Sequence, residues 1–97
     1  MILEPKYRKV ISDYFQNKPV LKAYLFGSYV RGDASEQSDI DILIELDYSQ
    51  AIGLAFVKMQ FDLQDILSRK VDLVSERGLS KFIKPFIEQE KELIYTR

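Results

Sequence analysis

The sequence predicts a small α/β protein in which helices pack on a mixed sheet of three to four strands. Two observations predict this fold class. Short apolar segments of strand length recur at residues 20–26, 39–46 and 70–75. Segments with apolar residues three and four positions apart, the spacing of an amphipathic helix, precede and separate them. Strands separated by helices are typical of a mixed or parallel sheet that helices cover.

The first half of the chain reads as helix, strand, short helix and loop. Residues 4–17 (EPKYRKVISDYFQN) place Pro5 where a first helical turn tolerates proline, and apolar residues follow at helical spacing. Residues 20–26 (VLKAYLF) then form an apolar, aromatic-rich strand. Residues 28–32 (SYVRG) are long enough for one or two helical turns closed by a glycine, and residues 33–38 form a polar loop.

The second strand, residues 39–46 (DIDILIEL), separates two kinds of side chain on its two faces. The isoleucine face belongs to the core, and the face that carries Asp39, Asp41, Leu43 and Glu45 lies opposite. A long helix is expected from about residue 49 to residue 67, followed by a short strand at residues 70–75 (KVDLVS) with Asp72 opposite its apolar residues.

Residues 80–97 begin with a helical pattern, and the sequence does not fix where that helix starts or ends. The pattern begins at Ser80, but Pro85 comes too late for that helix start, so we expect a break or restart near Pro85. Residues 91–97, which include ELIYT, either extend this helix or pair as an edge strand, and periodicity does not decide between the two.

Composition limits the classes of protein that the chain can represent. Its 97 residues suit one domain, residues 1–97, with one modest core. A formal charge of −1 provides no basic surface for an extended nucleic acid. The chain has no cysteine and no histidine, so proton transfer and metal binding fall to carboxylates. No apolar run is long enough to span a membrane and the N-terminus does not resemble a signal peptide, so we expect a cytoplasmic protein.

Asp39 and Asp41 form an Asp-x-Asp pair at the start of the second strand, which is a weak signal alone and gains weight from the Gly-Ser turn twelve residues earlier. Residues two apart on a strand project to the same side with Cα atoms roughly 6.5 Å apart, so both carboxylates can converge on the same pair of cations. Burial of unpaired carboxylates is costly, and a divalent metal removes that cost. Magnesium is normally held by one or two carboxylates together with substrate phosphates. The pair therefore predicts a magnesium site for a phosphorylated substrate.

The turn before the short helix supplies the phosphate half of this prediction. Gly27 permits a tight turn and the close approach of a phosphate, and Ser28 adds a hydroxyl donor. Arg31, three residues further on, can present its guanidinium to the same phosphates. Asp72 on the next strand is a candidate third metal ligand and a candidate base that activates an attacking hydroxyl. These residues together predict a site for a nucleoside triphosphate and metal ions.

The string GSYVRGDASEQSDIDILIEL resembles the signature of the DNA polymerase β-like nucleotidyltransferase superfamily, and of its minimal nucleotidyltransferases in particular. The resemblance extends over nearly the whole chain and includes a terminal helix expected to end at Ile94 and Tyr95. It implies the nucleotidyltransferase fold, triphosphate binding by Gly27 and Ser28, and metal binding by three acidic residues, Asp39, Asp41 and Asp72. It also implies Mg²⁺-dependent transfer of AMP from ATP to a hydroxyl, with release of pyrophosphate.

The resemblance further implies a partner that presents this hydroxyl. Minimal nucleotidyltransferases lack the second domain that holds the acceptor in larger relatives. The family includes antitoxins of HEPN/MNT toxin-antitoxin pairs, which suggests an all-helical HEPN-type toxin as partner, adenylylated on a tyrosine, and assembly into a homo- or hetero-oligomer. Two alternatives remain: an antitoxin that neutralises its partner by binding alone, and nucleotidyl transfer to RNA or a small molecule.

Overall fold

The protein folds around a four-stranded mixed sheet with the strand order β3-β2-β1-β4. The computed structural model describes residues 3–97. The strands are β1 (Val20–Phe26), β2 (Ile40–Leu46), β3 (Val71–Ser75) and β4 (Glu92–Thr96). β1 pairs antiparallel with both β2 and β4, whereas β2 pairs parallel with β3. The predicted α/β class and mixed sheet are confirmed.

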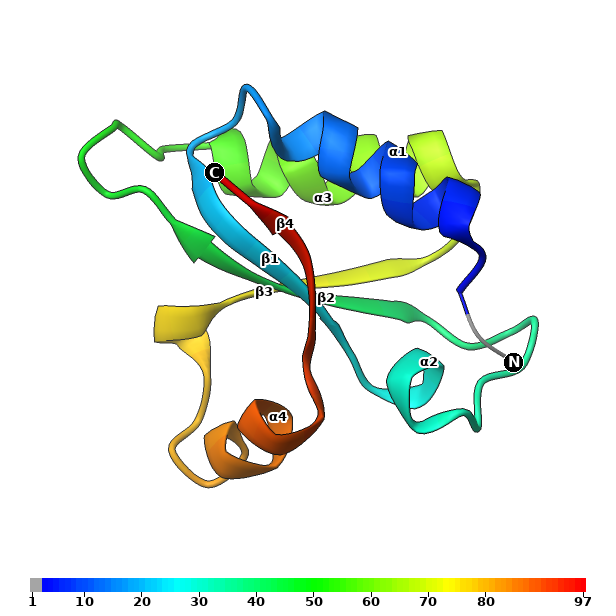
Figure 1. The fold of residues 1–97 in the computed structure, drawn as a ribbon. Helices are drawn as coiled ribbons and strands as arrows, with labels where there is room; N and C mark the ends of the chain where they lie inside the picture. The colour runs from blue at the N-terminus through cyan, green and yellow to red at the C-terminus, as the bar shows by residue number, and fades with distance from the viewer. Residues whose placement is uncertain (1–2) are drawn as a thin grey trace.

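The helices are distributed unequally over the two faces of this sheet. Figure 1 shows α1 (Pro5–Phe15) and α3 (Ala55–Leu67) side by side over one face, and α4 (Lys84–Glu90) on the opposite side. The one-turn helix α2 (Ser28–Arg31) follows β1 directly, and a 3₁₀ turn, η1 (Glu76–Gly78), follows β3. Within residues 3–97, no helix combines the length and the apolar character that crossing a bilayer requires.

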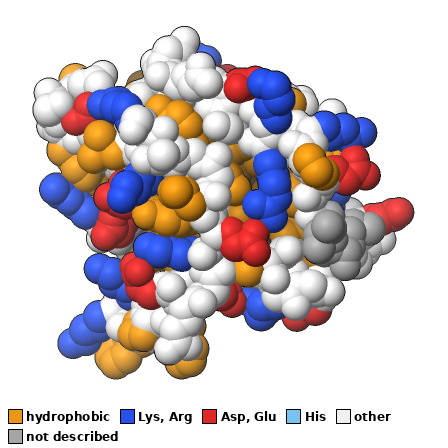
Figure 2. All heavy atoms as spheres, viewed as in Figure 1, with side chains coloured by type: hydrophobic (Ala, Val, Ile, Leu, Met, Phe, Trp, Pro, Cys, Tyr) orange, Lys and Arg blue, Asp and Glu red, His pale blue; other side chains and the backbone are white. Residues whose placement is uncertain are grey.

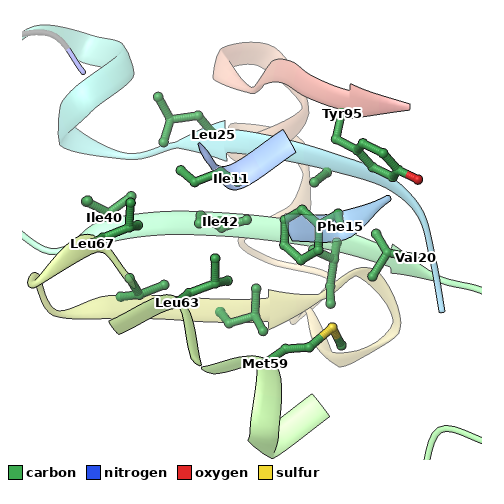
Figure 3. Packing of buried hydrophobic residues seen from close by; sticks show 14 of the residues in the cluster. Ile11, Phe15, Val20, Leu25, Ile40, Ile42, Met59, Leu63, Leu67 and Tyr95 are labelled. Carbon is green, nitrogen blue, oxygen red and sulfur yellow. The ribbon is translucent and has the colours of Figure 1, made fainter. Parts of the chain in front are cut away.

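The core fills the space between the sheet and the pair α1 and α3 (Figure 3). The isoleucine face of β2 points into it, as the alternation predicted, and these isoleucines are fully buried. Each such side chain contributes about 1.5–3 kcal/mol relative to exposure. The helices supply Ile11 and Phe15 from α1 and Met59, Leu63 and Leu67 from α3.

Three predicted element limits differ in the structure. The long helix begins at Ala55 rather than near residue 49. Asp47 accepts hydrogen bonds from the backbone and hydroxyl of Ser49 and from Gln50, which holds this segment as a turn, and Gly53 has a φ of +48° that a right-handed helix excludes.

The second and third differences lie in the C-terminal part. The predicted break near Pro85 is confirmed, but the helix starts only at Lys84, with Pro85 in its first turn, and residues 80–83 do not form a helix. Of the two alternatives for residues 91–97, the edge strand is confirmed: Ile94 and Tyr95 lie on β4, at the edge of the sheet, so the terminal helix that the resemblance implied does not reach them. Pairing with β1 satisfies the backbone there, and Tyr95 packs its ring 6.0 Å from that of Phe15.

Candidate active site

Sheet topology brings the predicted site residues together at one end of the strands, where β1 finishes and β2 and β3 begin. β1 runs antiparallel to β2, so the turn after β1 lies beside the start of β2, and β3 starts at the same end because it is parallel to β2. Asp41 is the cross-strand partner of both Phe26 and Asp72. Since Ile40 and Ile42 point into the core, Asp41 projects from the opposite face, away from α1 and α3.

The glycine turn packs directly against the Asp41 carboxylate. Gly27 is buried and has a φ of +78°, a conformation that L side chains rarely adopt. A Cβ atom added at this position would overlap Asp41 Oδ2 and lie 3.0 Å from Asp41 Cγ. A glycine is therefore required for two reasons, the backbone conformation and the close approach of the carboxylate.

Negative charge accumulates around Asp41. The pKa of its carboxyl is raised to about 6, chiefly by burial and then by the charges of Asp72 and Asp39. Arg31 acts in the opposite direction without cancelling these effects. A carboxylate that is partly desolvated beside two other acids is unfavourable by itself and becomes favourable when a cation binds.

The carboxylates suit a hard divalent cation in their donor chemistry, because Mg²⁺ prefers oxygen ligands. Their present arrangement does not enclose a metal ion: over residues 3–97, no three acidic, histidine or cysteine side chains form a group that could hold one. Asp39 instead pairs with Lys70, with 3.7 Å between Nζ and Oδ2. The structure thus places Asp41 beside Asp72 and the Gly27 turn, with Asp39 at the margin.

A carboxylate that sequence reasoning missed reaches this site from α4. Glu90 Oε1 accepts the backbone N–H of Gly27 at 2.9 Å, and both Glu90 oxygens lie 3.3 Å from Nη1 of Arg31. Arg31 also lies 3.5 Å from Asp33. Glu90 is 63 residues from Gly27 in the chain, so no local sequence signal could have revealed the contact.

A cavity of about 440 Å³ opens over these groups. One part of its lining is polar and comes from Gly27, Arg31, Asp41 and Glu90, whereas the remainder is apolar and comes from Phe26, Ile83, Phe86 and Ile87. A second hollow of about 290 Å³, between Leu21 and Arg77, contains none of the predicted site residues. The first cavity therefore combines charged groups with an apolar wall, as sites for small organic ligands do.

Hydrogen bonds from Arg69 hold the loop that precedes Asp39. The Arg69 guanidinium donates to the backbone oxygens of Glu36 and Ser38, at 3.1 and 3.2 Å, and to the hydroxyl of the buried Tyr29. Ser38 Oγ accepts the backbone N–H of Ser35 at 2.8 Å. These contacts fix the path of the chain between α2 and β2, and so fix the start of the acidic strand.

Comparisons with known proteins agree with this geometry. The nucleotidyltransferase domain family matches residues 5–94. A protein of Methanocaldococcus jannaschii, named provisionally as a protein adenylyltransferase, is 35% identical over 93 residues, which span 94% of this chain and 88% of the relative. A solved structure described, also provisionally, as a minimal nucleotidyltransferase has a TM-score of 0.77 at 28% identity and covers 90% of this chain and 88% of its own.

A chain from a crystal structure of a mutant MntA toxin-antitoxin complex is also similar. Its TM-score is 0.70 at 26% identity, over 100% of this chain and 75% of that one. Fold and site thus define a nucleotidyltransferase, an enzyme class that joins a nucleotide to an acceptor. The chain belongs to the nucleotidyltransferase domain family, which confirms the resemblance to minimal nucleotidyltransferases.

Proposed function

We propose that this protein is a Mg²⁺-dependent protein adenylyltransferase that transfers AMP from ATP to a hydroxyl of a HEPN-type toxin, and so acts as its antitoxin. One observation carries the proposal: the Gly27 turn packs on Asp41, and Asp41 lies in register with Asp72. A phosphate-binding turn and neighbouring carboxylates are the parts that phosphoryl-group transfer requires. The relative named a protein adenylyltransferase and the MntA complex support the choice of acceptor and partner.

Each predicted residue has a role in this reaction. Gly27 and Ser28 bind the triphosphate through the turn and the Ser28 hydroxyl, and Arg31 pairs with phosphate oxygens. Asp41, with Asp39 and Asp72, would hold Mg²⁺. Bound there, Mg²⁺ would neutralise the carboxylates and polarise the phosphates.

The transfer itself is a displacement at the α-phosphorus. The acceptor oxygen, from a tyrosine in our proposal, forms a bond to the α-phosphorus as the bond to the bridging oxygen of the β-phosphate breaks, and pyrophosphate leaves. We assign the proton of the attacking hydroxyl to Asp72; its exposure to solvent and its register with Asp41 on the neighbouring strand support this role. The acidic groups come from β2 and β3 and the loop before β2, and the phosphate-binding groups come from the turn after β1 and from α2.

An apolar surface next to the cavity supports docking of a protein acceptor. Phe82 and Phe86 are 76% and 72% exposed, and Ile83 is 53% exposed. Figure 2 shows hydrophobic side chains gathered at the lower edge of the molecule, in the region of α4. Exposed apolar residues beside a reactive site are typical of a binding surface for another macromolecule.

The direct test is transfer of labelled AMP from ATP, with Mg²⁺, to a HEPN-type protein, for which the product of the neighbouring gene is the first candidate to examine. The wild type should label the partner and Asp41→Asn should not. Asp65→Asn is the matched control, since Asp65 is an exposed aspartate of α3 on the other side of the sheet, and it should label at the wild-type rate. Absence of transfer by the wild type would contradict the proposal.

Neutralisation by binding alone is the second candidate, and the exposed α4 surface favours it. Growth of cells that express the toxin separates the two functions. If Asp41→Asn still protects cells while Phe86→Ser does not, binding is sufficient. If Asp41→Asn binds the toxin but fails to protect, transfer is necessary. The third possibility, transfer to RNA or a small molecule, is tested by offering these acceptors to the purified protein without a partner.

A further inference from the structure

The Glu90 carboxylate lies where an anionic ligand of the site would have to bind. Its Oε1 accepts a hydrogen bond from the Gly27 N–H at 2.9 Å, and both of its oxygens lie 3.3 Å from Nη1 of Arg31. Arg31 is the basic residue in the lining of the 440 Å³ cavity. A negatively charged side chain of the protein therefore occupies two of the donors that the proposed function assigns to the triphosphate, the Gly27 N–H and Arg31 Nη1.

This arrangement is unfavourable for the carboxylates of the site. Glu90 lies close enough to Asp41 to act on it as a like charge, in addition to Asp72 and Asp39. A second carboxylate beside a buried one costs free energy, which the Gly27 N–H and Arg31 offset. The single Gly27 N–H cannot donate fully to Glu90 and to a phosphate oxygen at the same time, and a phosphate at Arg31 Nη1 would have to take the place of the Glu90 oxygens.

We propose that Glu90 is an internal competitor for the polyphosphate of the nucleotide: it holds the Gly27 amide and Arg31 until the triphosphate displaces it, and it thereby lowers the affinity for nucleotide. The inference rests on the proposed function and adds a residue that tunes it. Glu90 is the last residue of α4, and Phe86, one turn earlier on the same helix, lines the same cavity. Glu90 and the apolar wall of the cavity thus belong to the same short helix.

A purely structural role for Glu90 makes the opposite prediction. If the contact only attaches α4 to the turn, its loss should loosen the site and leave nucleotide binding unchanged or weaker. If Glu90 competes with phosphate, removing its charge should strengthen binding. The sign of the change in affinity thus separates the two roles.

The test compares wild type, Glu90→Gln and Glu88→Gln in calorimetric binding of an ATP analogue with a methylene group between its α- and β-phosphates, in the presence of Mg²⁺. Glu88 is the matched control: it is on the same helix and its removal changes the charge equally, but it pairs with Lys91 at 2.9 Å and does not line the cavity. Loss of one competing charged contact should tighten binding by Glu90→Gln about fivefold, with Glu88→Gln unchanged.

A second readout does not depend on adenosine. Titration with inorganic triphosphate should give the same order of affinities. In the absence of ligand, the amide resonance of Gly27 should shift on Glu90→Gln, because the charged carboxylate that accepts its hydrogen bond is replaced by a neutral amide. Thermal unfolding of each variant checks that it is folded.

The outcomes are distinct for the two proposals. If the wild type binds the analogue and Glu90→Gln binds it equally or more weakly, the competitor role is overturned and the proposed function stands. If neither protein binds the analogue or triphosphate, both are overturned. Binding by Glu90→Gln alone would support competition in its strongest form.

Discussion

The two faces of the sheet are built for different purposes. The face under α1 and α3 is a dry apolar core in which the β2 isoleucines are fully buried. The opposite face, at the edge where β2 and β3 begin, gathers Asp41, Asp72 and Glu90 around a glycine turn. One strand thus supplies both fully buried core isoleucines and Asp41, a carboxylate whose pKa burial and neighbouring acids raise.

The largest expected effect is a loss of transfer activity without a loss of stability, on substitution of an acidic residue of the candidate active site. Asp72→Asn removes the proposed proton acceptor, and we expect transfer to slow by about 10²–10⁴-fold. The free energy of unfolding should stay within about 0.5 kcal/mol, because the Asp72 side chain is exposed. Single-turnover kinetics and urea unfolding of the same preparation measure both quantities. A fully active Asp72→Asn would remove this residue from the chemistry.

The next prediction examines the packed face. Leu63→Ala should lower the free energy of unfolding by about 2–5 kcal/mol, because Leu63 of α3 is fully buried and the substitution leaves a cavity. Phe61→Ala on the same helix is the control, since Phe61 is 59% exposed and its loss should cost about 0.5 kcal/mol or less. Below its melting temperature, Leu63→Ala should retain the wild-type transfer rate. A large loss of activity in folded Leu63→Ala would show that the two faces are coupled.

Two glycines with positive φ differ in what alanine would meet. Gly32 is left-handed, with φ +87° and ψ 7°, so alanine there costs about 1–2 kcal/mol of backbone strain. Gly27, with φ +78° and ψ −151°, lies outside the left-handed region in a conformation that is essentially restricted to glycine. An added Cβ at Gly27 would also overlap Asp41 Oδ2, whereas at Gly32 no atom lies within 4 Å of it. Gly27→Ala should therefore be the less stable of the two and lose nucleotide binding, as chemical denaturation and calorimetry can measure. Equal effects would mean that the overlap is relieved without cost.

The smallest effect is a dependence of stability on pH. The pKa of Asp41 is raised from its usual 3.8 to about 6, so the folded protein holds a proton that the unfolded chain has released. Stability should therefore fall as pH rises from about 4 to 6 and stay constant above that. Allowing for partial exposure, the loss is on the order of 1 kcal/mol.

Asp41→Asn should remove this dependence. The variant should be more stable than wild type at pH 7.5 and equal to it near pH 4, whereas Asp65→Asn should follow the wild-type curve. Urea unfolding across this pH range is the measurement. A wild-type stability that rises between pH 4 and 6 with Asp41 as its source would contradict the raised pKa.

Much of the fold could be predicted because the relevant patterns are local. The alternation in β2 identified its core face, Gly27 and Gly32 marked the limits of the short helix, and Pro85 marked the helix restart. The sequence misled at the start of α3, which the Asp47 turn and Gly53 shortened. It left residues 91–97 undecided between helix and strand, and pairing with β1 made residues 92–96 a strand.

The site follows the same division. Gly27, Ser28, Arg31 and the three aspartates were identifiable by residue type and spacing, and their functional roles stay predictions. Their mutual placement could not be predicted from spacing, since Asp41 meets Asp72 only through the parallel register of β2 and β3. The pairing of Asp39 with Lys70 and of Arg31 with Glu90 was also not visible in the sequence.

The sequence by itself determined which chemistry is possible: oxygen ligands without histidine or cysteine, a glycine turn, and a strand with one acidic face. Tertiary structure alone decided that α4 returns Glu90 to the Gly27 amide, 63 residues away in the chain. The physical reason is that residue type and periodicity act over a few residues, whereas charge and hydrogen bonding act between whichever groups the packing of the whole chain brings together.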